Sequence, residues 1–445
     1  MKKNIQIYIV SLGCAKNWLD TEIMAGSAVS SGMLITPYLE EADIFLINTC
    51  SFIFDARTEA EQNIREALLW KKKKKRRKVV VAGCLPQRNI DEVQGQYPDV
   101  DLFLGLNDVA SFPRLVETMY AGDAAAPQMG ECTYIYDENT PRLQLTPSTY
   151  AYLKIAEGCN HKCAFCAIPL IRGLQRSRPV DSIVREAKNL IGNGVYELIL
   201  IAQDTTSYGT DLDEDASLPM LIAALDRIEA DFCIRILYTH PLHFSDDVIA
   251  MFATSKHLVP YVDIPLQHAS TSVLKAMKRG ATEQTTRNLV ERIKQGIPAV
   301  TLRSTFIVGF PGETEADYQA LKQFILDAEF DRLGVFTYSP EEGTSAAGLN
   351  DGLVPADVAE ARRDELMQLQ SEIALKKNQA KIGRVLEVII EGEDDEGIVG
   401  RTFGDAPEVD NLVHVEIPEG VTELPPMIQV RITDAETYDL FGQLA

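Results

Sequence analysis

The apolar residues in the first third of the chain follow a pattern that predicts a parallel sheet. Three short runs rich in β-branched residues lie at Ile5–Leu12, Ile44–Asn48 and Val79–Ala82, and each has the length of a buried strand. Helical periodicity occupies the intervening segments Leu19–Ser31 and Asp55–Trp70. Alternating strands and helices are typical of a doubly wound α/β domain, so we predict one at the N-terminus.

The same alternation continues through the middle of the chain. The strand candidates are Tyr150–Ala156, Glu197–Ala202, Cys233–Tyr238, Tyr261–Leu266, Val300–Val308 and Leu333–Tyr338. The helical runs are Val180–Ile191, Leu218–Ala230, Asp246–Ala253, Thr271–Lys278, Glu283–Gln295 and Glu315–Ala328. Six strand–helix units are fewer than the eight that close a full barrel, so we predict a partial (β/α)6 barrel with an open side.

The last part of the chain changes from long helices to short strands. Leu369–Ala380 is expected to be a helix that leads out of the barrel. The following strand candidates are Arg384–Glu391, Gly397–Phe403, Leu412–Ile417 and Met427–Asp434. Short strands separated by Gly and Pro turns predict a small all-β barrel.

Length and charge constrain the number of domains and the kind of partner. A chain of 445 residues is expected to hold two to four domains, and the patterns assign them to residues 1–145, 146–375 and 376–445. The net charge of −22 disfavours broad binding to nucleic acid and suits a basic protein partner. No segment approaches the ~20 apolar residues of a membrane span, so we expect no membrane contact.

Cys159, Cys163 and Cys166 have the spacing C-x3-C-x2-C on a tight loop after an apolar run. Three thiolates can ligate three irons of a [4Fe–4S] cluster and leave the fourth iron open to a small molecule. A structural zinc site with His161 as the fourth ligand is an alternative, although His161 lies awkwardly inside the first spacer. Three inert buried cysteines are the other alternative. We favour a catalytic cluster.

A second set of cysteines ends the three strands predicted in the first domain. Cys14, Cys50 and Cys84 each follow a small residue at the carboxyl end of an apolar run. Because those ends form the binding crevice of a doubly wound sheet, the three thiols are expected to converge as ligands of a second cluster. Ordinary buried cysteines are the alternative. Cys233 lies in an apolar strand and is expected to pack there, and Cys132 is left without a role.

The cysteines and one basic run bear on the cellular environment. Iron–sulfur ligands must stay as thiolates, which requires a reducing compartment, so we expect a cytoplasmic protein. The eight consecutive cations Lys71–Lys78 are expected to be a solvated helix end or loop, with a contact to RNA phosphates as the alternative.

The cysteine spacing around Phe165 resembles that of the radical S-adenosylmethionine (SAM) superfamily. The resemblance implies that the open iron chelates SAM, that Phe165 packs near the adenine, and that one electron cleaves SAM to a 5′-deoxyadenosyl radical. It also implies an electron donor of flavodoxin or ferredoxin type.

Polar residues and glycines near the ends of the barrel strands are candidates for further SAM contacts. Gln203 follows the second strand, Arg303 lies inside the fifth, and Gly309 follows the fifth. Active sites of barrel folds form at the carboxyl ends of the strands, so we predict cofactor contacts for all three. A simple turn at Gly309, and an outward-pointing Arg303, are the alternatives.

Three motifs together with the cysteine triplet resemble the methylthiotransferases over nearly the whole chain. The motifs are Ser11-Leu-Gly-Cys-Ala-Lys-Asn17, Asn48-Thr-Cys50 and Ala82-Gly-Cys84. This resemblance implies two [4Fe–4S] clusters, of which the N-terminal one takes part in sulfur delivery. It also implies a C-terminal TRAM domain, a module that usually binds RNA.

The charge of the last segment favours one branch of that family. Residues 381–445 hold four Lys or Arg against fifteen Asp or Glu, which is unsuited to gripping tRNA phosphates. One branch modifies a tRNA adenosine, and the other adds a methylthio group to the β-carbon of an aspartate in a small-subunit ribosomal protein. Arg401–Asp410 resembles the second branch, which we favour, with a basic ribosomal protein as substrate and a contact with the ribosome. A tRNA-modifying enzyme and a non-catalytic iron–sulfur module that binds the ribosome are the alternatives.

Overall fold

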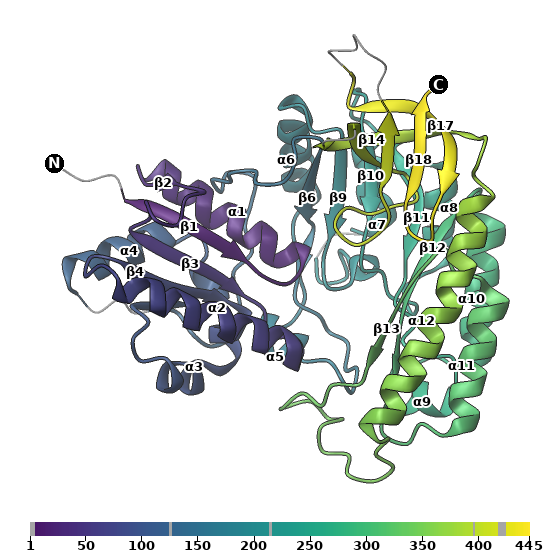
Figure 1. The fold of residues 1–445 in the computed structure, drawn as a ribbon, viewed down its shortest axis with the longest axis horizontal. Helices are drawn as coiled ribbons and strands as arrows, with labels where there is room; N and C mark the ends of the chain where they lie inside the picture. Colours follow the sequence, from purple (N-terminus) through teal and green to yellow (C-terminus); the bar gives the residue numbers. More distant parts are fainter. Residues whose placement is uncertain (1–4, 124–126, 213–215, 395–396, 417–423) are drawn as a thin grey trace.

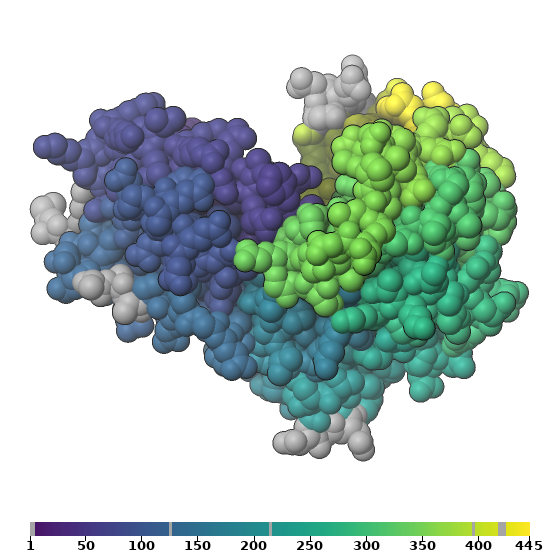
Figure 2. Space-filling model, turned by 90° about the horizontal axis from the view of Figure 1, so that it is seen from below, coloured from purple at the N-terminus to yellow at the C-terminus, as the bar shows by residue number. Residues whose placement is uncertain are grey.

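A computed structural model describes residues 5–123, 127–212, 216–394, 397–416 and 424–445 of the chain. Figure 1 shows a parallel sheet flanked by helices at the N-terminus, an open barrel in the centre and a small all-β barrel at the C-terminus. In Figure 2 the N-terminal domain and the rest of the chain form two lobes that meet along one side. The predicted three-part fold class is confirmed.

The N-terminal domain is a five-stranded parallel sheet in the order β2-β1-β3-β4-β5. Its strands are β1 (Gln6–Ser11), β2 (Leu34–Ile35), β3 (Ile44–Thr49), β4 (Lys78–Gly83) and β5 (Leu102–Leu104). Its helices are α1 (Ala15–Ser30), α2 (Phe54–Lys72), α3 (Cys84–Gln96), α4 (Phe112–Ala121) and the short 3-10 helix η1 (Leu106–Asp108). Helices α1 and α4 cover one face and α2 and α3 the other. The strand order reverses between β1 and β3, where doubly wound sheets open a crevice.

The run of eight cations spans the end of α2, the loop that follows it and the first residue of β4. Arg77 is fully buried, stacks 4.3 Å from the centroid of the Trp70 ring and pairs with Glu40 at 2.7 Å. Lys71 and Lys78 both pair with Asp101, at 2.7 and 2.9 Å. The cations of the run are therefore partly anchored to the domain, while residues 72–76 are exposed.

The central domain is an open sheet of six parallel strands in the order β6-β9-β10-β11-β12-β13. Its strands are β6 (Tyr150–Lys154), β9 (Glu197–Ile201), β10 (Cys233–Ile236), β11 (Leu258–Asp263), β12 (Thr301–Val308) and β13 (Arg332–Thr337). Its helices are α5 (Ile168–Arg172), α6 (Val180–Gly192), α7 (Leu218–Leu225), α8 (Asp246–Thr254), α9 (Thr271–Ala276), α10 (Glu283–Gly296), α11 (Glu315–Ala328) and the 3-10 helix η2 (Thr205–Ser207). The short pair β7 (Ala156–Glu157) and β8 (Arg176–Ser177) brackets the cysteine loop.

The C-terminal part consists of one long helix and a closed five-stranded barrel. Helix α12 (Ala356–Gln379) begins well before the predicted Leu369. The prediction missed its first half because few side chains are buried there, so the apolar pattern is weak. The barrel order is β14-β15-β16-β18-β17. Its strands are β14 (Val385–Asp394), β15 (Gly397–Thr402), β16 (Val413–Glu416), β17 (Met427–Ala435) and β18 (Leu440–Leu444). Ile417, the last residue of one predicted strand, lies outside the described residues. Neither α12 nor any other helix of the described ranges is both long and apolar enough to cross a membrane.

Buried ion pairs attach the C-terminal barrel to the amino ends of the central strands. Glu197, the first residue of β9, pairs with Arg235 at 2.7 Å and also with Arg401, and all three side chains are fully buried. Arg332, the first residue of β13, pairs with Asp405. Because this module occupies the amino edge of the sheet, the carboxyl edge is left to form the site.

Candidate active site

All six cysteines assigned to clusters line one cavity of about 430 Å³ between the two larger domains. Cys14, Cys50 and Cys84 come from the carboxyl edge of the first sheet. The other three belong to the loop between β7 and α5, at the carboxyl edge of the central sheet. The remaining two cysteines of the chain, Cys132 and Cys233, are buried and do not line the cavity.

Glycine allows the turns of the first cysteine set to approach each other. Gly13 has a φ of +92°, and a Cβ there would lie 2.7 Å from the Cβ of Cys50. Gly83, just before Cys84, has a φ of +96°, and a Cβ there would lie 2.2 Å from Oδ1 of Asn48. Both positions require a left-handed backbone and the absence of a side chain.

Two asparagines of the quoted motifs join the three turns that carry these cysteines. The Asn17 amide donates to the carbonyl oxygens of Leu12 and Thr49 at 3.0 and 2.9 Å. Asn48 donates to the Asn17 carbonyl at 2.7 Å, and the Cys84 thiol donates to Asn17 Oδ1 at 3.3 Å. The motif residues therefore fix the relative positions of the cysteines.

The loop of the second cysteine set is fixed by backbone contacts. Gly158 has a φ of +81°, and a Cβ there would lie 2.0 Å from the Leu174 carbonyl oxygen. The Cys159 amide donates to the Gly173 carbonyl at 3.1 Å, and the Ala164 amide donates to the Met277 carbonyl at 2.9 Å. The loop is therefore held on both sides before any ligand binds.

The thiols of the two sets lie in unequal electrostatic surroundings. Burial raises the pKa of Cys159 to about 11 and those of Cys166 and Cys84 to about 12. Burial would also raise the pKa of Cys14, but the charges of Lys16 and Arg172 bring it below its ordinary value. A thiol must lose its proton to bind iron, so iron must compete with protons at the thiols whose pKa is raised.

A buried network of charges joins the two cysteine-bearing loops. Arg172, at the end of α5, donates to both carboxylate oxygens of Glu157 at 3.0 and 2.9 Å and to Asp20 at 3.1 Å. Lys154 donates to Asp20 at 2.7 Å and to Glu157 at 2.6 Å. Arg172 also reaches Asn17 Oδ1 at 2.6 Å. These contacts were not predicted, although a lysine inside the apolar run of β6 was a visible signal.

Of the three predicted SAM contacts outside the cysteine loop, the structure places only Gln203 at the cavity. Its side-chain amide donates to Glu157 at 2.5 Å. Arg303 does not line the cavity and instead pairs with Asp263 at 2.9 Å and with Asp410 of the C-terminal module at 3.4 Å. The prediction for Arg303 overlooked these partners because Asp410 is remote in the sequence.

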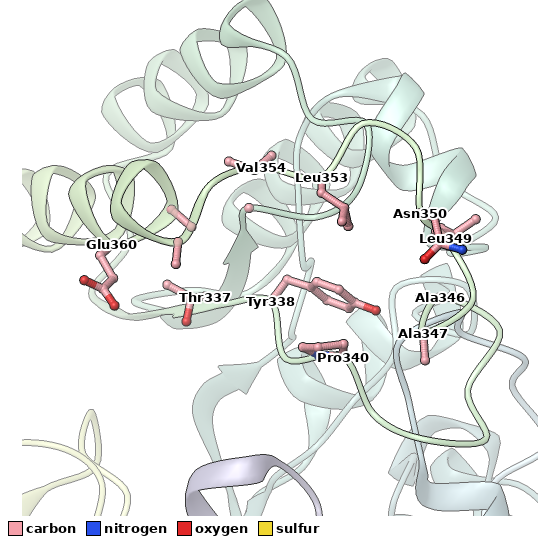
Figure 3. Close-up of a pocket in the computed structure, with 13 residues that line it drawn as sticks. Thr337, Tyr338, Pro340, Ala346, Ala347, Leu349, Asn350, Leu353, Val354 and Glu360 are labelled. Carbon is pink, nitrogen blue, oxygen red and sulfur yellow. The ribbon is translucent and has the colours of Figure 1, made fainter.

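Gly309 lines a separate pocket of about 340 Å³ beside α12 (Figure 3). It has a φ of +75°, and a Cβ there would lie 2.5 Å from the Cβ of Ala359 in α12. Its amide donates to Glu313 at 2.6 Å. These contacts give Gly309 a packing role, and the structure does not bring it together with the cysteines.

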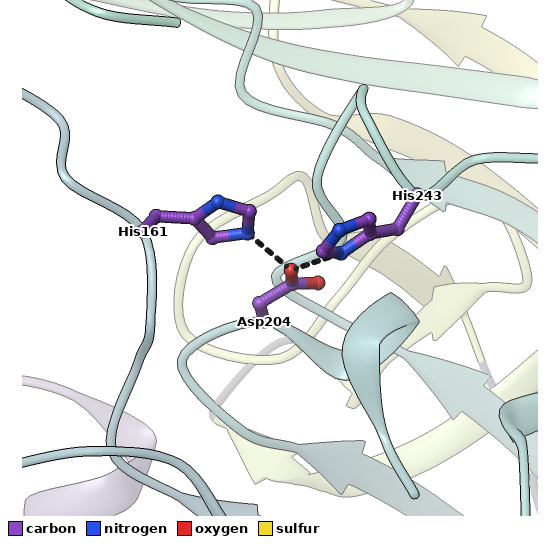
Figure 4. Close-up of side chains that lie close together, drawn as sticks. All are labelled: His161, Asp204 and His243. Carbon is purple, nitrogen blue, oxygen red and sulfur yellow. Dashed lines mark hydrogen bonds and ion pairs between the residues drawn. The ribbon is translucent and has the colours of Figure 1, made fainter. Parts of the chain in front are cut away.

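His161, between the first two cysteines of the loop, is held by Asp204 (Figure 4). Its Nε2 lies 2.7 Å from Asp204 Oδ2, and Nδ1 of His243 lies 3.0 Å from the same oxygen. The His240 ring stacks on His161 with centroids 3.7 Å apart. Burial would raise the pKa of Asp204, but the two imidazoles hold it well below its usual range. The three donor atoms are close enough for a metal ion, although hydrogen bonds alone account for their arrangement.

Two strained residues and one arginine complete the barrel side of the cavity. Tyr238 and Gln267, just after β10 and near the end of β11, have φ values of +62° and +74°. Non-glycine residues with positive φ are concentrated at functional sites. Arg279 donates to the Cys163 sulfur at 3.3 Å and lies 2.6 Å from Nε2 of His240. Sequence reasoning missed Tyr238 and Arg279, because neither belongs to a recognisable motif.

A second cleft of about 530 Å³ shares Phe165, Gln267 and Thr305 with the cysteine cavity. It is also lined by Phe54 and Phe336, whose side chains are more than half exposed. The cavity and this outer cleft therefore adjoin each other at the shared side chains.

An open six-stranded barrel with a three-cysteine loop, facing three more cysteines on a parallel sheet, defines a radical SAM enzyme of the methylthiotransferase class. Residues 153–325 match the radical SAM superfamily, residues 6–105 match the uncharacterized protein family UPF0004, and residues 382–444 match the TRAM domain. The chain belongs to the RimO family of ribosomal protein uS12 methylthiotransferases. Membership implies iron–sulfur and SAM cofactors.

The relatives match over nearly their whole length. The chain is 44% identical to ribosomal protein uS12 methylthiotransferase RimO of Trichlorobacter lovleyi, over 99% of this chain and 98% of the relative. It is 43% identical to that of Symbiobacterium thermophilum, over 99% of this chain and 91% of the relative. Among solved structures, the radical SAM methyltransferase TsrM from Kitasatospora setae has a TM-score of 0.57 at 12% identity, covering 77% of this chain and 74% of TsrM. That similarity concerns the fold alone.

Proposed function

We propose that this protein adds a methylthio group to the β-carbon of an aspartate in ribosomal protein uS12, with two [4Fe–4S] clusters and SAM as cofactors. The observation that carries the proposal is the single cavity lined by both sets of three cysteines. Each set offers three thiols, which leaves one iron of each cluster open. One space bounded by two such clusters suits a reaction that needs both at the same carbon.

The donor atoms and charges around the cavity suit two clusters. Cys14, Cys50 and Cys84 would hold the N-terminal cluster, and Cys159, Cys163 and Cys166 the other. A cluster with three thiolates carries negative charge, and Lys16, Arg172 and Arg279 line the same cavity. Bound there, the clusters and SAM would supply the one-electron chemistry that an unactivated carbon requires.

The chain's own residues would position the reactants and exclude water. The cations and backbone contacts described above hold the two cysteine loops in fixed positions, and Gln203 is held against Glu157 at the wall. Phe165 lies at the junction of the cavity and the outer cleft, where an adenine ring would stack. The outer cleft would admit the substrate segment, and a flavodoxin or ferredoxin would supply electrons.

Surface charge favours a protein substrate over tRNA. In the C-terminal module, Glu391, Asp405 and Asp410 form ion pairs that attach it to the barrel or brace that attachment. Six further acids there are exposed, namely Glu387, Glu393, Glu408, Glu416, Asp434 and Glu436. Such a surface repels phosphates and attracts a basic ribosomal protein.

The test compares deletion and complementation in cells with iron analysis of the purified protein. We expect ribosomal protein uS12 from a deletion strain to lack the mass of one SCH2 unit, and the wild-type gene to restore it. Anaerobically reconstituted protein should bind about eight irons per chain, and either Cys50→Ala or Cys163→Ala about four. An unmodified uS12 in the complemented strain, with the methylthio group found on a tRNA adenosine instead, would reject the proposal.

A further inference from the structure

Lys16 is a buried cation in the wall of the cysteine cavity. It lies in the first turn of α1, its side chain is only 7% exposed, and it lines the cysteine cavity. Its ammonium lies 3.0 Å from the centroid of the Tyr238 ring of the barrel. Among the described residues, none accepts a hydrogen bond from this ammonium and no carboxylate pairs with it. An ammonium has three donors, and burial without an anion is costly.

The other two cations of the wall both donate hydrogen bonds to protein atoms. Arg172 is held by Glu157 and Asp20. Arg279 donates to the Pro265 carbonyl at 2.7 Å, in addition to its contacts with Cys163 and His240. Lys16 differs from both, because among the described residues none accepts a hydrogen bond from its ammonium.

Lys16 is placed where the carboxylate of a substrate aspartate would lie. It follows Cys14 by two residues, and its ammonium reaches across to Tyr238 on the barrel side of the cavity. A substrate carbon that reacts with groups on both sides must lie between them. In an aspartate the carboxylate is attached directly to the β-carbon, so its oxygens would lie at the cavity wall.

We propose that Lys16 binds the side-chain carboxylate of the substrate aspartate and thereby selects aspartate over its amide. This inference rests on the proposed function. The ammonium and the carboxylate would form a charge-assisted hydrogen bond at the cavity wall, where Lys16 is buried. In the free protein the face of Tyr238 holds the ammonium in place by a cation–π contact.

A competing explanation is that Lys16 only offsets the charge of the cluster held by Cys14. The charge of Lys16 lowers the pKa of Cys14, but no hydrogen bond links its ammonium to any of the thiols, so its donors can still bind a substrate carboxylate. Arg172, by contrast, donates to the Cys84 sulfur at 3.5 Å and already supplies a positive charge there. The two explanations differ in what they predict for substrate discrimination.

The experiment is a double-mutant cycle on the fully reconstituted protein under anaerobic conditions. One peptide spans the modified aspartate of uS12, and a second carries asparagine at that position. Wild-type protein is expected to bind the aspartate peptide more tightly by a factor on the order of 100, the cost of removing one partner of a buried charge pair. Lys16→Met is expected to bring the ratio of dissociation constants close to one. Lys275→Met removes an exposed charge on α9 and serves as the matched control, with the wild-type ratio.

Two outcomes would overturn the inference. The first is an aspartate-to-asparagine ratio that Lys16→Met leaves unchanged. The second is a loss of about half the iron in Lys16→Met, since the lysine would then serve the cluster. Methylthiolation of the aspartate peptide by the wild-type protein is measured in parallel. Failure of that reaction would refute the proposed function, whereas a wild-type reaction with an unchanged binding ratio would refute the role of Lys16 alone.

Discussion

Arg172 connects the two cysteine-bearing loops, and Arg172→Met is expected to destabilise the protein strongly. Its guanidinium is almost fully buried and forms a two-pronged contact with Glu157 at 3.0 and 2.9 Å. It also contacts Asp20, on α1 of the other domain, at 3.1 Å. Methionine fills a similar volume and removes the charge, so the variant isolates the electrostatic contribution.

The magnitude follows from the charges that remain. Without Arg172, Glu157 and Asp20 share Lys154, so two buried carboxylates face one ammonium. Removing one partner from a buried ion pair costs about 3–5 kcal/mol. At roughly 2–4 °C per kcal/mol for a domain of this size, the midpoint of thermal unfolding should fall by about 6–20 °C.

Calorimetry of three variants under anaerobic conditions tests this reasoning. Glu157→Gln alone leaves two buried cations, Arg172 and Lys154, with one carboxylate, Asp20. The buried charges are then unbalanced in this variant as well. The double variant Arg172→Met/Glu157→Gln leaves Lys154 and Asp20 as a single neutral pair. Its loss should therefore be smaller than the sum of the two single losses, by at least about 2 kcal/mol. Losses that add without coupling would refute the reasoning.

Two further predictions concern the cysteine turn and a buried histidine. Gly13→Ala places a Cβ 2.7 Å from that of Cys50, so iron analysis should find about half the wild-type iron; full occupancy would contradict this. His268 is fully buried, and burial lowers its pKa to about 4, below the ~6.5 of an unfolded histidine. The unfolded chain binds more protons between these values, so stability is lost as pH falls from about 6.5 to 4. The melting temperature of His268→Gln should fall less than that of the wild type between pH 7 and pH 5, and equal falls would exclude this cause.

Strands with a long apolar run were predictable from the sequence, and very short ones were not. Strands β1, β3 and β4 span six residues each and lie where the apolar runs predicted them. Strands β2 and β5 have two and three residues, too few to display a period. Their extended conformation depends on pairing with the neighbouring strand, which is a tertiary contact.

Topology alone could bring the cysteines and Gln203 to one cavity, but it did not reveal the surroundings of Arg303 and Gly309. A cysteine at the carboxyl end of a strand has a position that the rules of parallel sheets determine. Arg303 lies toward the amino end of β12 (Thr301–Val308), where Asp410, from a different domain, pairs with it. Gly309 likewise packs against Ala359 of α12. The surroundings of these two residues are set by partners that are remote in the sequence, and a local sequence pattern does not predict such partners.

The acidity of the C-terminal module has two physical roles that the net charge alone does not separate. Asp405 and Asp410 are paired with arginines of the barrel, so they hold the module in place and contribute little to its surface. Arg401 is likewise buried and paired with Glu197 and Glu391. Docking therefore removes charges of both signs from the surface. Of the basic residues in this module, the arginines that remain exposed are Arg384 and Arg431, against six exposed acids among the residues that the structure describes. The surface presented to a partner is thus acidic because of residues outside these ion pairs, and it still favours a basic protein substrate.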